Sequence, residues 1–261
     1  LLPLVTAEHP HQQFARPLAL HLRSELYWFE GSPLLSPTYR HAMATQNRLS
    51  NIDRDHLRTY GGDFERLCQT FVEFVHRLPF YGVAVLCIDD PQVRAVLPMV
   101  SRPMLTYGIS ADADFRATHI EIRGLAWRFR AERPAGHEPL DVVINLPGTH
   151  NVLNALAAIA VATEEGVSDT AILAGLKAFS GVGRRFDVAD AVLVAGKRVA
   201  VVDDYGHHPT EVAMVVETAR KVWPDRRLVM IYQPHRYTRT HDLYDDFTKV
   251  LSTVDKLVLL E

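Results

Sequence analysis

Residues 199–239 have the sequence VAVVDDYGHHPTEVAMVVETARKVWPDRRLVMIYQPHRYTR, and this stretch decides the fold. Apolar runs at 199–202 and 228–232 have the length and β-branched content of buried strands. The residues between them, 210–222, have helical spacing, and a further helix and strand are predicted before the chain reaches residue 260. Alternation of strand and helix predicts an α/β unit with a doubly wound parallel sheet.

Polar segments follow both apolar runs. Residues 203–209 (DDYGHHP) follow the first strand and residues 233–239 (QPHRYTR) follow the second. In an open parallel sheet, ligands bind at the carboxyl ends of the strands. Because arginine forks suit carboxylate and phosphate, we expect a crevice there that binds an anion. The alternative is a pair of polar surface loops joined by a salt bridge.

Composition narrows the class of protein. The chain has 261 residues, of which 48% are hydrophobic and 23% are charged, and its net charge is −3. These values are typical of a globular protein, and the negative charge argues against nucleic acid or an anionic membrane as a partner. The longest apolar run, 152–162, is too short to span a bilayer. Cys68 and Cys87 lie in apolar surroundings, which favours free thiols in the cytoplasm.

The region before this stretch predicts a second unit. Asp63 is placed to cap a helix over 64–77, and the apolar run 83–88 predicts a buried parallel strand. Alternating segments between 115 and 146 predict a small antiparallel appendage to that parallel sheet. We therefore expect an α/β protein: a parallel-sheet central domain with the appendage, a joint at 181–183, and a Rossmann-like C-terminal domain.

Residues 1–48 stand apart from the rest. They show no sustained helical or strand periodicity, and they remain unassigned. The segment 41–50 (HAMATQNRLS) also lacks the apolar run of a buried strand. We therefore expect no packed strand immediately before Asn51.

Three short motifs each allow two interpretations. His56, in the NIDRDH segment 51–56, suits a metal ligand, although a surface histidine paired with aspartate has the same pattern. Asn151 and Asn154 are spaced to face one side of a first helical turn and bind a nucleobase edge, or Asn151 merely caps the helix. Arg185 either contacts a phosphate from the joint or is simply solvated.

Taken together, five motifs resemble the Mur ligases. They are NIDRDHLRTYGGDFE, HNVLNALAAIAVATEEG, GVGRRFD, VDDYGHHPTEV and QPHRYTRTHDLYDDF, and the resemblance covers roughly residues 50–261. The last two are most similar to the branch of the family that joins L-alanine to UDP-N-acetylmuramate. That resemblance implies phosphorylation of the muramate carboxylate by ATP with Mg²⁺, and attack of the alanine amine on the acyl phosphate.

The resemblance also implies residue roles. It assigns Mg²⁺ to His56 and the catalytic roles to His207, His235 and Arg236. It assigns the nucleotide to Asn151, Asn154, Arg185 and Asp204. It assigns muramate binding to five residues: Tyr205, His207, His235, Arg236 and Arg239.

Under the same resemblance, residues 49–182 form part of the central ATP-binding domain and residues 183–261 part of the C-terminal domain. The family's phosphate loop contains Gly-Lys-Thr, whereas here Gly196-Lys197 is followed by Arg198. Its lysine and backbone amides bind the β- and γ-phosphates. The alternative function is therefore a catalytically inactive module, without the phosphate loop and the UDP-binding domain, that binds nucleotide or a partner weakly.

Overall fold

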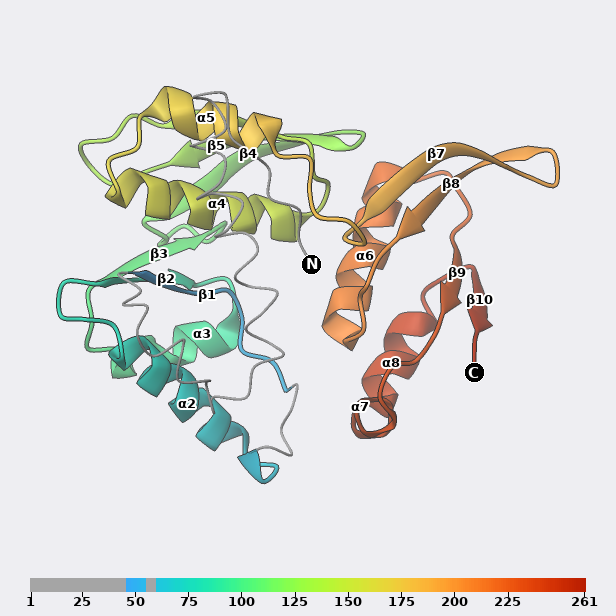
Figure 1. Cartoon of the computed structure of the whole chain (residues 1–261), viewed down its shortest axis with the longest axis horizontal. Coiled ribbons are helices and arrows are strands. Elements are labelled where there is room, and N and C mark those ends of the chain that lie inside the picture. Colours follow the sequence, from blue (N-terminus) through green and yellow to red (C-terminus); the bar gives the residue numbers. More distant parts are fainter. Residues whose placement is uncertain (1–45, 55–59) are drawn as a thin grey trace, which may run out of the picture. The chain divides into compact units, whose positions relative to one another are not determined.

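A computed structural model describes residues 46–54 and 60–261. Two compact units make up the chain (Figure 1). The first comprises the described residues up to Glu121 with Arg128–Ile144 and Val152–Phe179, and the second comprises Ile122–Trp127, Asn145–Asn151 and Ser180–Glu261.

The first unit holds a six-stranded sheet in the order β1-β2-β3-β4-β5-β6. Its strands are β1 (Gln46–Leu49), β2 (Val83–Cys87), β3 (Met104–Gly108), β4 (Phe115–Arg123), β5 (Ala126–Glu132) and β6 (Leu140–Ile144). Strands β1 to β4 pair in parallel. A two-residue turn joins β4 to β5, and turns of this length join antiparallel strands. The expected α/β class is confirmed, with the appendage continuing the parallel sheet.

Strand β1 corrects one expectation. Gln46–Leu49 lies parallel to β2, with Leu49 opposite Leu86, and Leu49 is buried. The expectation that no strand precedes Asn51 is therefore wrong. The local sequence QNRL has little apolar character, but a backbone beside β2 satisfies its hydrogen bonds whatever its side chains are. Residues 1–45 lie outside the described part of the chain.

Aspartate side chains cap two helices of the first unit. The helices described in this unit are α2 (Phe64–His76), α3 (Pro91–Val96), η3 (Leu97–Met99), α4 (Thr149–Glu164) and α5 (Asp169–Ala178). Asp63 accepts the backbone N–H groups of Glu65 and Arg66 at 2.9 and 3.1 Å, so the predicted cap of α2 is confirmed. Asp90 caps α3 in the same way. Side chains of α2 and α3 pack with those of β1 and β2 in one buried cluster.

The second unit contains two small sheets. Its elements are β7 (Asp187–Val194), β8 (Lys197–Asp203), α6 (Pro209–Val222), β9 (Val229–Tyr232), α7 (Tyr237–Asp242), α8 (Tyr244–Leu251) and β10 (Lys256–Leu259). Strands β9 and β10 pair in parallel, with α7 and α8 between them in sequence. Val212 and Val216 of α6 pack with Tyr232 of β9 and Phe247 of α8.

Strand β8 pairs differently from the sequence prediction. It forms an antiparallel hairpin with β7, whereas we expected it beside the strand at 228–232 in one parallel sheet. The turn consists of Ala195 and Gly196, both with positive φ (48° and 76°). A two-residue turn with positive φ at both positions matches the twist of a hairpin, so β8 pairs with its neighbour in sequence. Among the helices described, none has both the length and the hydrophobicity needed to cross a membrane.

We expect Phe115→Ala to destabilise the first unit by about 3–5 kcal/mol, because Phe115 is 1% exposed and its loss leaves a cavity. Phe80→Ala is the matched control, since Phe80 is 85% exposed, and it should change stability by no more than about 0.5 kcal/mol. Chemical denaturation followed by circular dichroism measures both. Equal effects would contradict the described core.

We expect Asp255 to make the second unit sensitive to acid. The Arg220 guanidinium and the Leu228 N–H hold the pKa of Asp255 at about 2, against an ordinary value of 3.8. A depressed carboxyl pKa stabilises the fold above the unfolded value, and that contribution disappears as pH falls from about 4 to about 2. Asp255→Asn should lack this component, so denaturation midpoints of the two proteins should converge at low pH. Midpoints that stay equally separated throughout would contradict the assignment.

Candidate functional site

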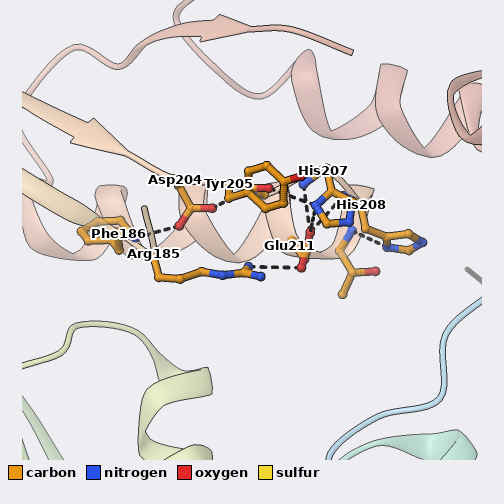
Figure 2. A network of polar contacts seen from close by, with 9 residues as sticks. Arg185, Phe186, Asp204, Tyr205, His207, His208 and Glu211 are labelled. Carbon is orange, nitrogen blue, oxygen red and sulfur yellow. Dashed lines mark hydrogen bonds and ion pairs between the residues drawn. The ribbon is translucent and has the colours of Figure 1, made fainter. Parts of the chain in front are cut away.

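The DDYGHHP segment connects the end of β8 to the start of α6. Asp204 lies in it with its carboxylate turned toward the protein backbone, and burial raises its pKa above the ordinary value. One oxygen accepts the N–H of Phe186 at 2.7 Å and the other accepts the N–H of Gly206 at 2.6 Å. The Tyr205 N–H donates to the Arg184 carbonyl at 2.8 Å. These bonds tie the GRRF segment to the loop before α6 (Figure 2).

Glu211, in the first turn of α6, organises the other half of this loop. Its Oε2 accepts the backbone N–H groups of His207 and His208 at 2.9 and 3.1 Å. Its Oε1 lies 3.2 Å from Nη1 of Arg185. In Figure 2 the Arg185 side chain extends along the loop toward this carboxylate. The predicted nucleotide-binding arginine and the predicted catalytic histidine therefore share one carboxylate.

Aromatic rings line the same loop. The Tyr205 and His207 rings lie edge to face with centroids 5.2 Å apart, and the Arg184 guanidinium lies 4.8 Å from the Tyr205 ring centroid. The His235 ring, from the loop after β9, lies 6.4 Å from that of His207. The two predicted polar segments thus meet at His207 and His235.

The remaining residues of the QPHRYTR segment lie at the start of α7. Arg236 occupies the N-cap position with φ 67°, and its side chain is exposed. Arg239 is 7% exposed. Burial raises the pKa of Tyr232 to about 12, although the charge of Arg239 acts in the opposite direction. The structure therefore places one arginine of the segment at the surface and the other against the end of β9.

The two predicted nucleobase residues lie in the first turns of α4. Asn151 is the third residue of that helix and donates from Nδ2 to the Pro147 carbonyl at 2.7 Å, so it is not the N-cap residue. Asn154 accepts at Oδ1 from Nη2 of Arg48 at 2.6 Å. Arg48 also donates from Nε to the Tyr107 hydroxyl at 3.2 Å. A residue of β1 thus holds the Asn154 amide in place.

His150, which directly precedes Asn151, is held neutral. Burial, and next the charge of Arg185, lower its pKa to about 4. Its ring lies against Gly148, whose φ is 107°, and a Cβ at that position would come within 2.5 Å of the ring. Glycine is therefore required at this turn by both its dihedral angle and its contact.

His56, the predicted metal ligand, lies outside the described residues. Within 46–54 and 60–261, no three His, Cys, Asp or Glu side chains are grouped so as to hold a metal ion.

Two residues that contact the site, Glu211 and Arg48, were not predicted from the sequence. Glu211 had a detectable signal, since it lies three residues after the N-cap position of a helix, as in a capping box. Arg48 had none, because its contacts to Tyr107 and Asn154 join segments that are distant in sequence.

We expect Asp204→Asn to destabilise the second unit by about 1–3 kcal/mol, because the new amide NH₂ would face a buried backbone N–H. Asp203→Asn is the control, since Asp203 is exposed and its ion pair with Arg184 is long, at 3.9 Å. It should have little effect. Urea denaturation measures both, and a neutral Asp204→Asn would contradict the inward orientation of this carboxylate.

Comparison with known proteins identifies the family. A model of the Mur ligase middle domain matches residues 43–162, and a model described as Mur ligase, glutamate ligase domain, matches residues 184–261. UDP-N-acetylmuramate–alanine ligase MurC from Thermotoga maritima is 22% identical, with a TM-score of 0.67, over 97% of this chain and 59% of its own. MurF from Acinetobacter baumannii is 24% identical, with a TM-score of 0.67, over 85% and 48%.

MurF ligase from Thermotoga maritima, solved in complex with ADP, is 19% identical, with a TM-score of 0.65, over 84% of this chain and 49% of its own. The chain thus spans about half the length of these structures. At these identities the likeness shows a shared fold, and MurC and MurF match equally well by TM-score. Because the two domain models together cover well over half of it, the chain belongs to the Mur ligase family.

Proposed function

We propose that these two domains serve a cytoplasmic ligase of peptidoglycan precursor synthesis that joins L-alanine to UDP-N-acetylmuramate at the expense of ATP. The observation that carries the proposal is the meeting of Arg185, Tyr205, His207 and His235 around the start of α6, in a chain with both Mur ligase domain models. MurF from Thermotoga maritima, with the same fold, was solved with ADP, which supports a nucleotide as one ligand.

The proposed reaction requires positive charge close to an acyl phosphate. A fixed cation or N–H donor stabilises charge that develops in the transition state. Arg185 uses Nη1 for Glu211, and a guanidinium has five N–H donors with which to reach a phosphate. Arg236, exposed at the start of α7, is proposed to bind the muramate carboxylate. The rings of His207 and His235 lie close to each other, and both are proposed to contact the reacting groups.

The nucleotide and the metal complete this proposal. We propose that Asn151 and Asn154 contact the adenine and that Asp204 lies near the ribose. Mg²⁺, when bound, would offset the charge between the triphosphate and the carboxylate, with His56 as a proposed ligand. Tyr205 and Arg239 are proposed to contact the muramate moiety. The proposal that L-alanine is the amino-acid substrate is based on the DYGHHP and PHRYTR motifs.

A second function is a module that binds nucleotide without ligating. The observation in its favour is that Gly196-Lys197 is followed by arginine and that no Gly-Lys-Thr or Gly-Lys-Ser occurs in the 261 residues. The lysine and amide nest of such a loop normally bind the β- and γ-phosphates.

Phosphate release from ATP and Mg²⁺ separates the two functions. For a ligase, release requires UDP-N-acetylmuramate and L-alanine together, and mass spectrometry detects the amide product. His56→Ala should then abolish release. If calorimetry shows ADP binding but no combination of substrates releases phosphate, the binding module is the correct function and the ligase proposal fails.

We expect Arg236→Ala to lower the rate of phosphate release on the order of 10²-fold, because one fixed donor to developing charge contributes about that much. Arg227→Ala is the matched control, since Arg227 is an exposed arginine of the same unit, in the segment before β9. It should retain the wild-type rate. Equal rates for the two variants would remove Arg236 from the site.

A further inference from the structure

Glu211 makes more contacts than a helix cap requires. A capping box needs its carboxylate only for the backbone N–H of the N-cap residue, here His208. Glu211 also accepts the N–H of His207 and pairs with Arg185, and its Oε2 lies 3.5 Å from Nδ1 of the His207 ring. It therefore contacts two residues of the proposed site, Arg185 and His207, and neither contact is needed to start α6.

The hydrogen bonds of the His207 ring determine its tautomer. Nδ1 lies 3.0 Å from the Tyr205 carbonyl oxygen, which can only accept, so Nδ1 must donate. The nearby Glu211 carboxylate favours a proton on the same nitrogen. In a neutral imidazole the other nitrogen is then an acceptor, so Nε2 presents a lone pair.

We propose that Glu211 is a positioning residue of this site, which holds Arg185 against the His207–His208 loop and keeps His207 in the tautomer with the proton on Nδ1. Nε2 of His207 is then available to accept a hydrogen bond or a proton from a ligand. The link to ligand chemistry rests on the proposed function, whereas the tautomer and the Arg185 contact do not.

The charge state of Glu211 agrees with this role. Burial raises its pKa, but the N–H groups of His207 and His208, together with the nearby His207 ring and the Arg185 guanidinium, outweigh burial, so the pKa lies below its ordinary value. The carboxylate is therefore ionised at neutral pH, as an anion shared among these donors must be.

The tautomer of His207 can be measured directly by nitrogen NMR of the imidazole ring, with the signal assigned by its loss in His207→Gln. In the wild type we expect Nδ1 to be protonated and Nε2 unprotonated. Glu211→Gln removes the charge beside Nδ1, so the ratio of the Nδ1–H to the Nε2–H tautomer should fall severalfold. Glu217→Gln is the matched control, because Glu217 is an exposed glutamate of the same helix whose ion pair is with Lys221, and it should leave the His207 signal unchanged.

Two results would overturn the proposal: an Nε2–H tautomer in the wild type, or an unchanged ratio in a folded Glu211→Gln protein. If that variant does not fold, Glu211→Asp withdraws the carboxylate from Nδ1 by one methylene group, and a smaller fall in the same ratio is expected. The NMR measurement does not require enzymatic turnover. If the tautomer ratio shifts as expected but no phosphate is released, the proposed function is wrong and the role of Glu211 as a positioning residue still holds. Where release occurs, Glu211→Gln should lower kcat/KM and Glu217→Gln should not.

Discussion

The loop between β8 and α6 depends on two partly buried carboxylates that accept backbone N–H groups. A helix start leaves several N–H groups without helical partners, and a tight loop before it adds more. Asp204 accepts the Gly206 N–H of this loop, and also the Phe186 N–H of the GRRF segment. Glu211 accepts the N–H groups of His207 and His208. Without these acceptors, the loop would have to leave N–H groups unsatisfied, at a cost of about 1–3 kcal/mol each. The positions of Tyr205 and His207 follow from this constraint.

The same two carboxylates also hold residues of the proposed site in the second unit. Asp204 ties the GRRF segment to the loop through Phe186, and Glu211 does so through Arg185. A proposed phosphate-binding arginine and a proposed catalytic histidine are therefore held by a single side chain. Pre-organisation of this kind lowers the reorganisation needed when charge develops on a ligand.

In the first unit the controlling constraint is the parallel sheet. Strands β1 to β4 lie side by side in parallel, and β1 is held there by its backbone pairing with β2 although its side chains are mostly polar. That pairing also carries Arg48 to Tyr107 and Asn154. A strand with no apolar pattern thus supplies a contact to a residue that the family resemblance assigns to the nucleotide.

Sequence by itself determined the features that arise within a few residues. The cap at Asp63, the helix–strand alternation, the α/β class and the polar segments after two apolar runs all follow from local spacing and composition. Only the tertiary structure decided which strands pair: β1 beside β2, and β8 with β7 across the Ala195–Gly196 turn. It also decided the partners of Glu211 and Arg48. The pairing of β1 with β2 and the contacts of Arg48 join residues far apart in the chain, which local patterns do not contain. The β7–β8 hairpin is local, but it depends on positive φ at both turn residues, one of which is an alanine.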